Sequence, residues 1–160
     1  MIIKKTQKFF LIILMLLPIS CGFKVLNKSE ANNYSIKSVI AKGDKRIGYK
    51  IKNYLLTYSN VNDQNQIMVY LDVSKDKIIK EKNIKNEITK YQINIKVNLN
   101  FYELGNTNDK KEINLSIEGD YSVDQIHSRT TANEKKLIEN LIENISGKLL
   151  NEIGIKLNDI

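Results

Sequence analysis

Three stretches of the chain alternate strictly between apolar and polar residues, which is the period of a strand buried on one side only. Their apolar phases are Ile67, Val69, Leu71 and Val73, then Tyr91, Ile93, Ile95, Val97, Leu99 and Phe101, then Ile113, Leu115, Ile117, Tyr121 and Val123. A shorter run from Tyr34 to Ile40, with Tyr34, Ile36 and Ile40 in one phase, predicts a further strand. Four half-buried strands are therefore expected.

Two other segments repeat their apolar residues every three or four positions, the period of an amphipathic helix. The first follows Gly43-Asp44, where Asp44 can cap a helix, and runs to about Ser59. The second opens at Thr131-Ala132-Asn133-Glu134, which has capping-box spacing, and Gly154 is a plausible stop. The polar run 106–109 supplies turn residues between the last two strands.

The order strand, helix, three strands, helix predicts an α+β fold, a two-layer α/β sandwich written β-α-β-β-β-α. A sheet with one apolar face needs a cover, and the two amphipathic helices are the available apolar surfaces. The helical crossover makes the first two strands parallel if they are adjacent, and the last three should form an antiparallel meander. We expect one domain over residues 34–160, consistent with roughly 100–200 residues per domain.

The N-terminal segment is expected to be an export signal and not part of the fold. Lys4, Lys5 and Lys8 precede an unbroken apolar run from Phe9 to Leu17, and Pro18-Ile19-Ser20 then lead to Cys21. The nine-residue run is too short to cross a hydrocarbon core of ~30 Å. We therefore assign residues 1–20 to a signal peptide and 21–33 to a tether.

Leu17-Pro18-Ile19-Ser20-Cys21 resembles the bacterial lipoprotein box, with Pro18 where that family usually has Leu. The resemblance implies that the Cys21 thiol is diacylated and becomes the mature N-terminus, and that acyl chains such as palmitate anchor the protein in a membrane. Gly22, in place of Asp, favours the outer membrane by resemblance to enterobacterial lipoprotein sorting. A plain signal peptide with an incidental cysteine is the alternative.

Composition and charge narrow the function classes further. The chain has net charge +7, and removing the three signal lysines leaves +4, which is too mild for a nucleic-acid binder. With one Cys and one His, neither a Cys–His or Ser–His–Asp set nor a zinc site is expected. Gly-rich phosphate loops and EF-hand loops are also missing from the sequence. We expect a protein that is not an enzyme and needs no metal or cofactor.

The segment from Lys75 to Lys90 is the one unusual charge feature. It holds six lysines against three acids, a net +3, interleaved with Ile78, Ile79, Ile84 and Ile88. One interpretation is a solvated, extended hairpin whose lysines protect a sheet edge. The other is an amphipathic surface for an anionic amphiphile, with lysines for phosphates and isoleucines for acyl chains. Arg129, expected in the loop before the last helix, could join that surface.

Several of these features together resemble the LPS-assembly lipoprotein family LptE. They are the start Cys21-Gly22-Phe23-Lys24, the strand entry Lys90-Tyr91-Gln92-Ile93-Asn94-Ile95, Asn133-Glu134 opening the last helix, and the element order over residues 34–153. The resemblance implies an outer-membrane lipoprotein, anchored on the periplasmic side, that plugs the barrel of an LptD-type protein, helps it fold, and binds lipopolysaccharide.

The same resemblance places lipopolysaccharide-binding residues nearest to Lys82, Lys85 and Arg129. The outward polar faces, such as those of Asn94 and Ser116, would suit hydrogen bonding to a barrel lumen. The alternative from another class is a free-standing lipid-carrier lipoprotein, which predicts an apolar cavity between sheet and helices and no stable partner. An envelope hydrolase is a third, more distant alternative.

Overall fold

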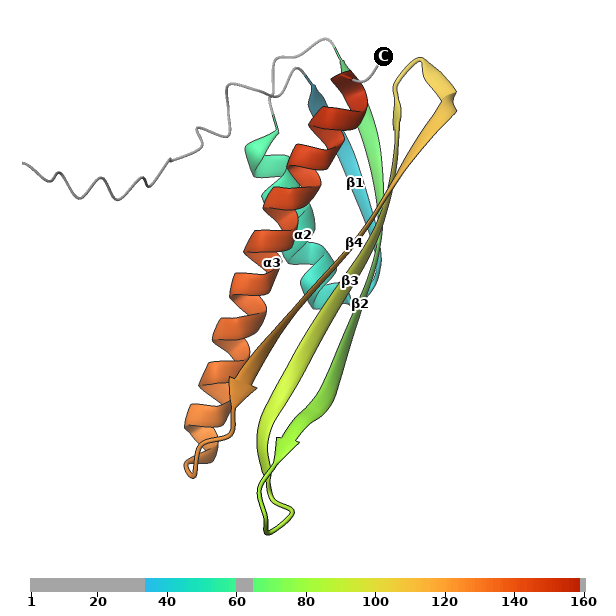
Figure 1. Ribbon diagram of the computed structural model, residues 1–160. Helices are drawn as coiled ribbons and strands as arrows, with labels where there is room; N and C mark the ends of the chain where they lie inside the picture. The colour runs from blue at the N-terminus through green and yellow to red at the C-terminus, as the bar shows by residue number, and fades with distance from the viewer. Residues whose placement is uncertain (1–33, 60–64, 159–160) are drawn as a thin grey trace, which may run out of the picture.

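The structure, a computed structural model, describes residues 34–59 and 65–158. The elements in chain order are β1 (Ser35–Gly43), α2 (Lys45–Tyr58), β2 (Gln66–Lys82), β3 (Ile88–Glu103), β4 (Asn106–Ser122) and α3 (His127–Asn158). The strands form one sheet in the order β1-β2-β3-β4, with β1 parallel to β2 and the other two pairs antiparallel. Both helices lie on one face of that sheet (Figure 1). The predicted α+β sandwich is confirmed.

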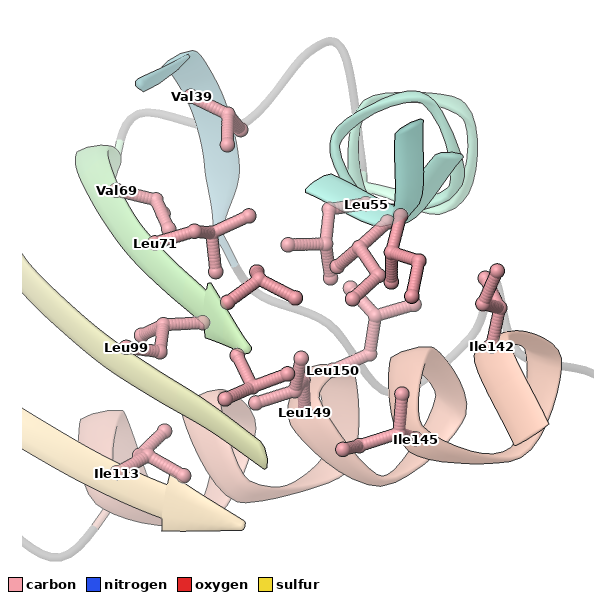
Figure 2. Packing of buried hydrophobic residues seen from close by; sticks show 14 of the residues in the cluster. Val39, Leu55, Val69, Leu71, Leu99, Ile113, Ile142, Ile145, Leu149 and Leu150 are labelled. Carbon is pink, nitrogen blue, oxygen red and sulfur yellow. The ribbon is translucent and has the colours of Figure 1, made fainter. Parts of the chain in front are cut away.

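The core lies between the sheet and the two helices, and the predicted apolar phases supply it. From the sheet, the fully buried side chains include Ile67, Val69, Leu71, Ile93, Ile95, Leu99 and Phe101, and from the helices Ile47, Ile51, Leu55, Ile145 and Leu149. Figure 2 shows helix and strand side chains of this cluster pointing toward one another. Burying each such side chain stabilises the fold by about 1.5–3 kcal/mol.

β1 departs from the simple alternation that the sequence suggested. Tyr34 and Ile36 are buried as expected, and the Tyr34 hydroxyl donates a hydrogen bond of 2.9 Å to the carbonyl of Leu150 in α3. The register with β2 shifts between Ile36 and Ser38, which moves the later residues of β1 to the opposite phase. Val39 is therefore buried and Ile40 is exposed on the uncovered face, so the expected common phase of Tyr34, Ile36 and Ile40 is wrong.

The passage from β1 into α2 follows the predicted chemistry. Asp44 is the N-cap, and its side chain accepts hydrogen bonds from the backbone amides of Arg46 and Ile47 at 3.1 and 3.0 Å. Gly43 precedes it with φ +82°, and an added Cβ would meet the carbonyl oxygen of Val73 at 2.1 Å. Only glycine satisfies this conformation and this close approach together.

Two strands, β2 and β4, are longer than the sequence pattern predicts at the ends next to turns. β2 continues nine residues past Val73 because β3 pairs with it along its length, so Lys75–Lys82 are strand residues. The turn between β3 and β4 lies at Leu104-Gly105, where Gly105 has φ +113°, and not at 106–109, which belong to β4. In both places, pairing with the neighbouring strand outweighs local turn propensity.

The last helix is longer than expected at both ends. It begins at His127, so His127 and Arg129 are helical and not in a loop, and it passes Gly154 to reach Asn158. Asp124 organises the entry: its Oδ1 accepts a hydrogen bond from the Ile126 amide, and its backbone amide donates to the Thr130 hydroxyl. The predicted capping box at Thr131–Glu134 is therefore wrong.

Candidate functional site

The sheet projects beyond its helical cover at one end. β1 ends at Gly43, opposite Val73, but β2 and β3 stay paired to Lys82 and Ile88 and form a long hairpin. Figure 1 shows β1 and α2 beside one half of the sheet only, with the hairpin extending past the start of α3. We use the term hairpin end for two segments that lie at this end of the molecule. One is the tip of the hairpin, residues 78–90, and the other is the β4–α3 connection with the first turn of α3, residues 123–130.

The loop at the tip of the hairpin is organised by one asparagine. The Asn83 Oδ1 accepts hydrogen bonds from the amides of Lys85 and Glu87 at 2.9 and 3.0 Å, and its Nδ2 donates to the Glu87 carboxylate at 2.7 Å. Asn86 adopts the left-handed conformation with φ +64°. The loop thus has a defined shape, and it holds Ile84 fully exposed at its tip.

The lysines of the hairpin end fall into two groups. Lys80 pairs with Asp120 on β4, and Lys90 pairs with Glu81 at 2.7 Å. Lys82 donates to the Asn86 side chain at 3.0 Å, and neither it nor Lys85 has a carboxylate partner among the described residues. Lys82 and Lys85 therefore retain positive charge that no neighbour neutralises.

Arg129 lies at the same end of the molecule. Its guanidinium is 3.9 Å from the Asp124 carboxylate, and the connection before α3 is tied to the hairpin by a bond from the Val123 amide to the Thr89 carbonyl. No hydrogen bond or ion pair within the described ranges joins Arg129 to Lys82 or Lys85. The structure thus brings the three predicted residues to one end, without direct contact between Arg129 and the tip.

Exposed apolar side chains also gather at the hairpin end. Five of the ten large hydrophobic residues that are exposed in the described part of the chain lie there: Ile78, Ile79, Ile84, Val123 and Ile126. Ile78, Ile79 and Ile84 belong to the isoleucines interleaved with the lysines in the sequence, but Ile126 was not singled out and Val123 was expected in the buried phase. An apolar group beside unpaired cations is suited to an amphiphilic anion.

A polar cluster separates the hairpin end from the core on the helix-covered face. Lys77 stands in the phase that continues Val73, and its ammonium is 2.7 Å from Glu134 and 4.4 Å from the ring centroid of Tyr91. The Tyr121 hydroxyl donates to the same Glu134 carboxylate at 2.7 Å. Glu134 therefore joins α3 to the sheet.

The contacts of the cluster shift the pKa values of Glu134, Lys77 and Tyr121. Burial raises the pKa of Glu134, but hydrogen bonds from Lys77 and Tyr121 outweigh burial, so its pKa is lowered. Burial lowers the pKa of Lys77, but the hydrogen bonds and charges of Glu134 and Tyr121 together outweigh burial, so its pKa is raised. For Tyr121, burial is the main reason that the pKa is raised. The Lys77–Glu134 pair is thus held in its charged form.

The other face of the sheet carries no helix in the described part of the chain (Figure 1). Its outward polar side chains include Asn94 and Ser116, which were predicted for it. The Ser116 hydroxyl donates to the Asn94 side chain at 2.8 Å. A tyrosine patch on this face, formed by Tyr70 and Tyr102 beside Met68, was not predicted. The two tyrosine hydroxyls are 3.2 Å apart, and the Tyr102 hydroxyl donates to the Met68 sulfur. The hydrogen bond to Tyr70 raises the pKa of Tyr102.

Other candidate chemistry finds no site in the described residues. Residues 34–59 and 65–158 contain no group of three or more His, Cys, Asp or Glu side chains placed to hold a metal ion. In the same ranges, neither helix is long and apolar enough to cross a membrane. Cys21, the predicted lipidation site, lies outside the described residues, as do the predicted signal peptide and tether.

Comparison with known proteins gives matches in fold but not in sequence. No protein-family model matches the chain, and no curated protein matches it. Its fold is similar to that of lipoprotein B from Nitrosomonas europaea, with a TM-score of 0.57 and 13% identity over 81% of this chain and 90% of that one. A minor lipoprotein from Acinetobacter baumannii gives 0.55 and 14% over 76% and 91%, and a lipoprotein from Caulobacter crescentus gives 0.53 and 16% over 77% and 90%. The chain therefore shares a fold with bacterial lipoproteins.

Proposed function

We propose that this protein is an LptE-like outer-membrane lipoprotein, anchored through Cys21 on the periplasmic side, that plugs an LptD-type β-barrel and binds lipopolysaccharide. In this proposal it assists barrel assembly and lipopolysaccharide delivery without catalysing a reaction. The observation that carries the proposal is the hairpin end, where a defined loop presents unpaired lysines beside exposed isoleucines. The fold that the chain shares with bacterial lipoproteins supports it.

The chemistry of the hairpin end fits the two parts of lipopolysaccharide that a protein can recognise near the membrane. Its phosphates require cations, which Lys82, Lys85 and Arg129 supply. Its acyl chains require apolar contacts, which Ile84 and Ile126 offer from exposed positions. Removing apolar surface from water is favourable by ~25 cal/mol per Å². Acyl chains that cover the exposed isoleucines would therefore contribute to the free energy of ligand binding.

The uncovered sheet face is suited to the barrel partner. Its asparagine, serine and glutamate side chains can hydrogen-bond to a polar lumen, and the tyrosine patch adds contact area. Asn100, beside this patch, has a buried side-chain oxygen without a hydrogen-bond partner in the described part of the chain. What a partner could reach is the hollow that Asn100 lines together with Tyr70, Tyr102 and Lys110.

The lipid-carrier alternative is less well supported. A carrier needs an apolar cavity between sheet and helices, but side chains such as Leu55, Leu99 and Ile145 are fully buried and meet in that space (Figure 2). These side chains occupy the space in the middle of the core that a carried acyl chain would need. The packing favours the plug over the carrier.

The lipopolysaccharide part of the proposal is tested with a triple variant in which Lys82, Lys85 and Arg129 are each replaced by glutamine. We expect the triple variant to bind lipopolysaccharide at least about tenfold more weakly, because each lost charge-assisted contact contributes on the order of 1.5–3 kcal/mol. The matched control changes Lys37, Lys42 and Lys148, which are exposed and away from the hairpin end, to glutamine. Equal binding by both triple variants, measured by surface plasmon resonance, would remove the hairpin end as the ligand site.

Ile84→Ser separates the apolar contribution from the charges. The side chain is fully exposed, so the substitution should leave the thermal midpoint unchanged while weakening lipopolysaccharide binding. Short-chain phosphate ligands without acyl groups should bind equally to wild type and variant.

The barrel part is tested by recovering the tagged, full-length protein from detergent-solubilised outer membranes. Recovery with one large β-barrel protein in a one-to-one ratio is the expected result. Recovery of the lipoprotein alone, under conditions that keep other barrel complexes intact, would contradict the plug and return attention to the carrier.

A further inference from the structure

A groove of about 300 Å³ opens on the helix-covered face, at the boundary between the core and the hairpin. It exists because β1 and α2 cover only half of the sheet, whereas α3 continues alone past the start of α2 (Figure 1). Ile47 of α2 and Ile138 and Ile142 of α3 form its apolar walls, and Lys75 of β2 lines it from the sheet.

Lys75 occupies a position where the strand pattern calls for a buried apolar residue. It follows Ile67, Val69, Leu71 and Val73 in the same phase, and it pairs across the sheet with Ile95. A lysine facing the covered side of a sheet is costly unless a partner neutralises it or solvent reaches it. The groove gives Lys75 that access, and in the described residues no carboxylate pairs with it.

The residues that line the groove carry one net positive charge, from Arg46, Lys50, Lys75 and Lys135 against Asp44, Glu134 and Glu139. Each carboxylate that lines it is already engaged: Asp44 caps α2, Glu134 binds Lys77 and Tyr121, and Glu139 lies 3.3 Å from Lys50. Three further cations line the groove, Arg46, Lys75 and Lys135, and none has an ion-pair partner among the described residues. The groove therefore combines isoleucine walls with three cations that form no ion pair in the described residues, and one of them, Lys75, also helps to lower the pKa of Glu134 through its charge.

We propose that this groove binds the phosphomonoester head of an acyl-chain amphiphile, with Arg46, Lys75 and Lys135 around the phosphate and the first methylenes against Ile138 and Ile142. A phosphomonoester carries nearly two negative charges at neutral pH and offers three acceptor oxygens, which matches a site with three unpaired cations. The site is separate from the hairpin end and does not depend on the proposed barrel partner.

The test uses the full-length protein in phosphatidylcholine nanodiscs, titrated calorimetrically with octyl phosphate and corrected with empty nanodiscs. We expect saturable binding of octyl phosphate, and about tenfold weaker binding for each of Lys75→Gln and Lys135→Gln, the loss expected for one charge-assisted contact. Lys136→Gln is the matched control, because Lys136 is exposed beside Lys135 on the same helix but does not line the groove.

Two further ligands and one further variant distinguish binding in the groove from binding through the alkyl chain alone, through phosphate alone, or at the hairpin end. Octyl glucoside should not bind, and inorganic phosphate should bind much more weakly than octyl phosphate because it lacks the chain. Lys82→Gln/Lys85→Gln should bind octyl phosphate as wild type does, so a failure of the proposed lipopolysaccharide site would not affect this result. No binding by wild type, equal binding by Lys75→Gln and Lys136→Gln, or equal affinity for inorganic phosphate would each overturn the proposal.

Discussion

The two halves of the β2–β3 ribbon have the same backbone pairing but opposite surroundings. In the half beside β1 and α2, the helix-facing positions of β2 are Ile67, Val69, Leu71 and Val73, and all are buried. In the hairpin half, the same phase of β2 continues as Lys75, Lys77 and Ile79, and all three are exposed. The ladder of hydrogen bonds to β3 runs through both halves. Strand pairing alone therefore does not determine whether a position of β2 is buried. Burial depends on whether the layer of helices and β1 continues over that position.

This difference assigns separate roles to the two halves. The covered half contains most of the fully buried side chains and so supplies most of the stability. The hairpin half still buries Ile93 and Ile95 of β3, but its β2 strand and the loop present cations and isoleucines to solvent. Substitutions in the covered half should change stability, and those in the hairpin half should change binding. Three substitution pairs test this contrast, in order of decreasing expected effect.

Phe101→Ala against Ile84→Ala tests the contrast most strongly. Phe101 is fully buried on β3, and its truncation should reduce the free energy of unfolding by about 3–5 kcal/mol through lost burial and the cavity left behind. Ile84 is fully exposed, so its truncation should change stability by less than about 0.5 kcal/mol. Urea denaturation followed by circular dichroism measures both. Similar losses for the two variants would show that the hairpin tip is part of the stabilising core.

Gly43→Ala against Gly105→Ala sharpens the role of the junction where β1 ends. Both glycines have positive φ, but only at Gly43 would an added Cβ collide with a backbone carbonyl, that of Val73; at Gly105 nothing lies within 4 Å. We expect a loss of about 2–4 kcal/mol for Gly43→Ala and about 1 kcal/mol for Gly105→Ala. Thermal unfolding by calorimetry distinguishes these values, and equal losses would mean that the close approach to Val73 relaxes at little cost.

Glu134→Gln tests the polar boundary between the two halves and should give the smallest effect. The lowered pKa of Glu134 means that the unfolded chain binds a proton more readily than the folded one. Its stabilisation is thus present above the ordinary glutamate pKa and is lost as pH falls through the lowered folded value. At neutral pH we expect a loss of about 0.5–1 kcal/mol, since the pair is partly exposed.

The measurement is urea denaturation of wild type and Glu134→Gln from neutral pH into the acid range. The difference between the two proteins should shrink toward zero in acid, where the wild-type carboxyl is protonated. Glu143→Gln, on an exposed position of the same helix, serves as control and should stay close to wild type throughout. A difference that persists unchanged in acid would mean that packing of Glu134, and not its charge, matters.

Much of the fold could be predicted from residue spacing. The period of two in the three alternating stretches, the helical period after Asp44 and in the last segment, and the Asp44 cap predicted the elements and the α+β sandwich. Each of these signals is local, because side-chain direction repeats along a single strand or helix. The boundaries failed where pairing between distant segments decided them, as at Lys75–Lys82 and at the turn Leu104-Gly105.

The candidate sites were only partly accessible to sequence reasoning. The interleaving of lysines and isoleucines between Lys75 and Lys90 indicated an amphipathic surface, and that composition is local. Which lysines remain unpaired was not predictable, since Lys80 is matched by Asp120 forty residues away and Lys77 by Glu134 on another element. The groove likewise depends on where α2 starts relative to α3.

Residue spacing alone gives the strands, the helices and the apolar faces that must meet, and it predicts an export signal that ends before Cys21. The tertiary structure decided which charges are neutralised, where the helical cover stops, and which apolar residues stay exposed. The two kinds of information differ in how far apart the interacting residues are in the sequence. The hydrophobic period and helix capping depend on a few neighbouring residues. Ion pairs, strand ladders and layer coverage join residues such as Lys77 and Glu134, which are brought together only when the chain has folded.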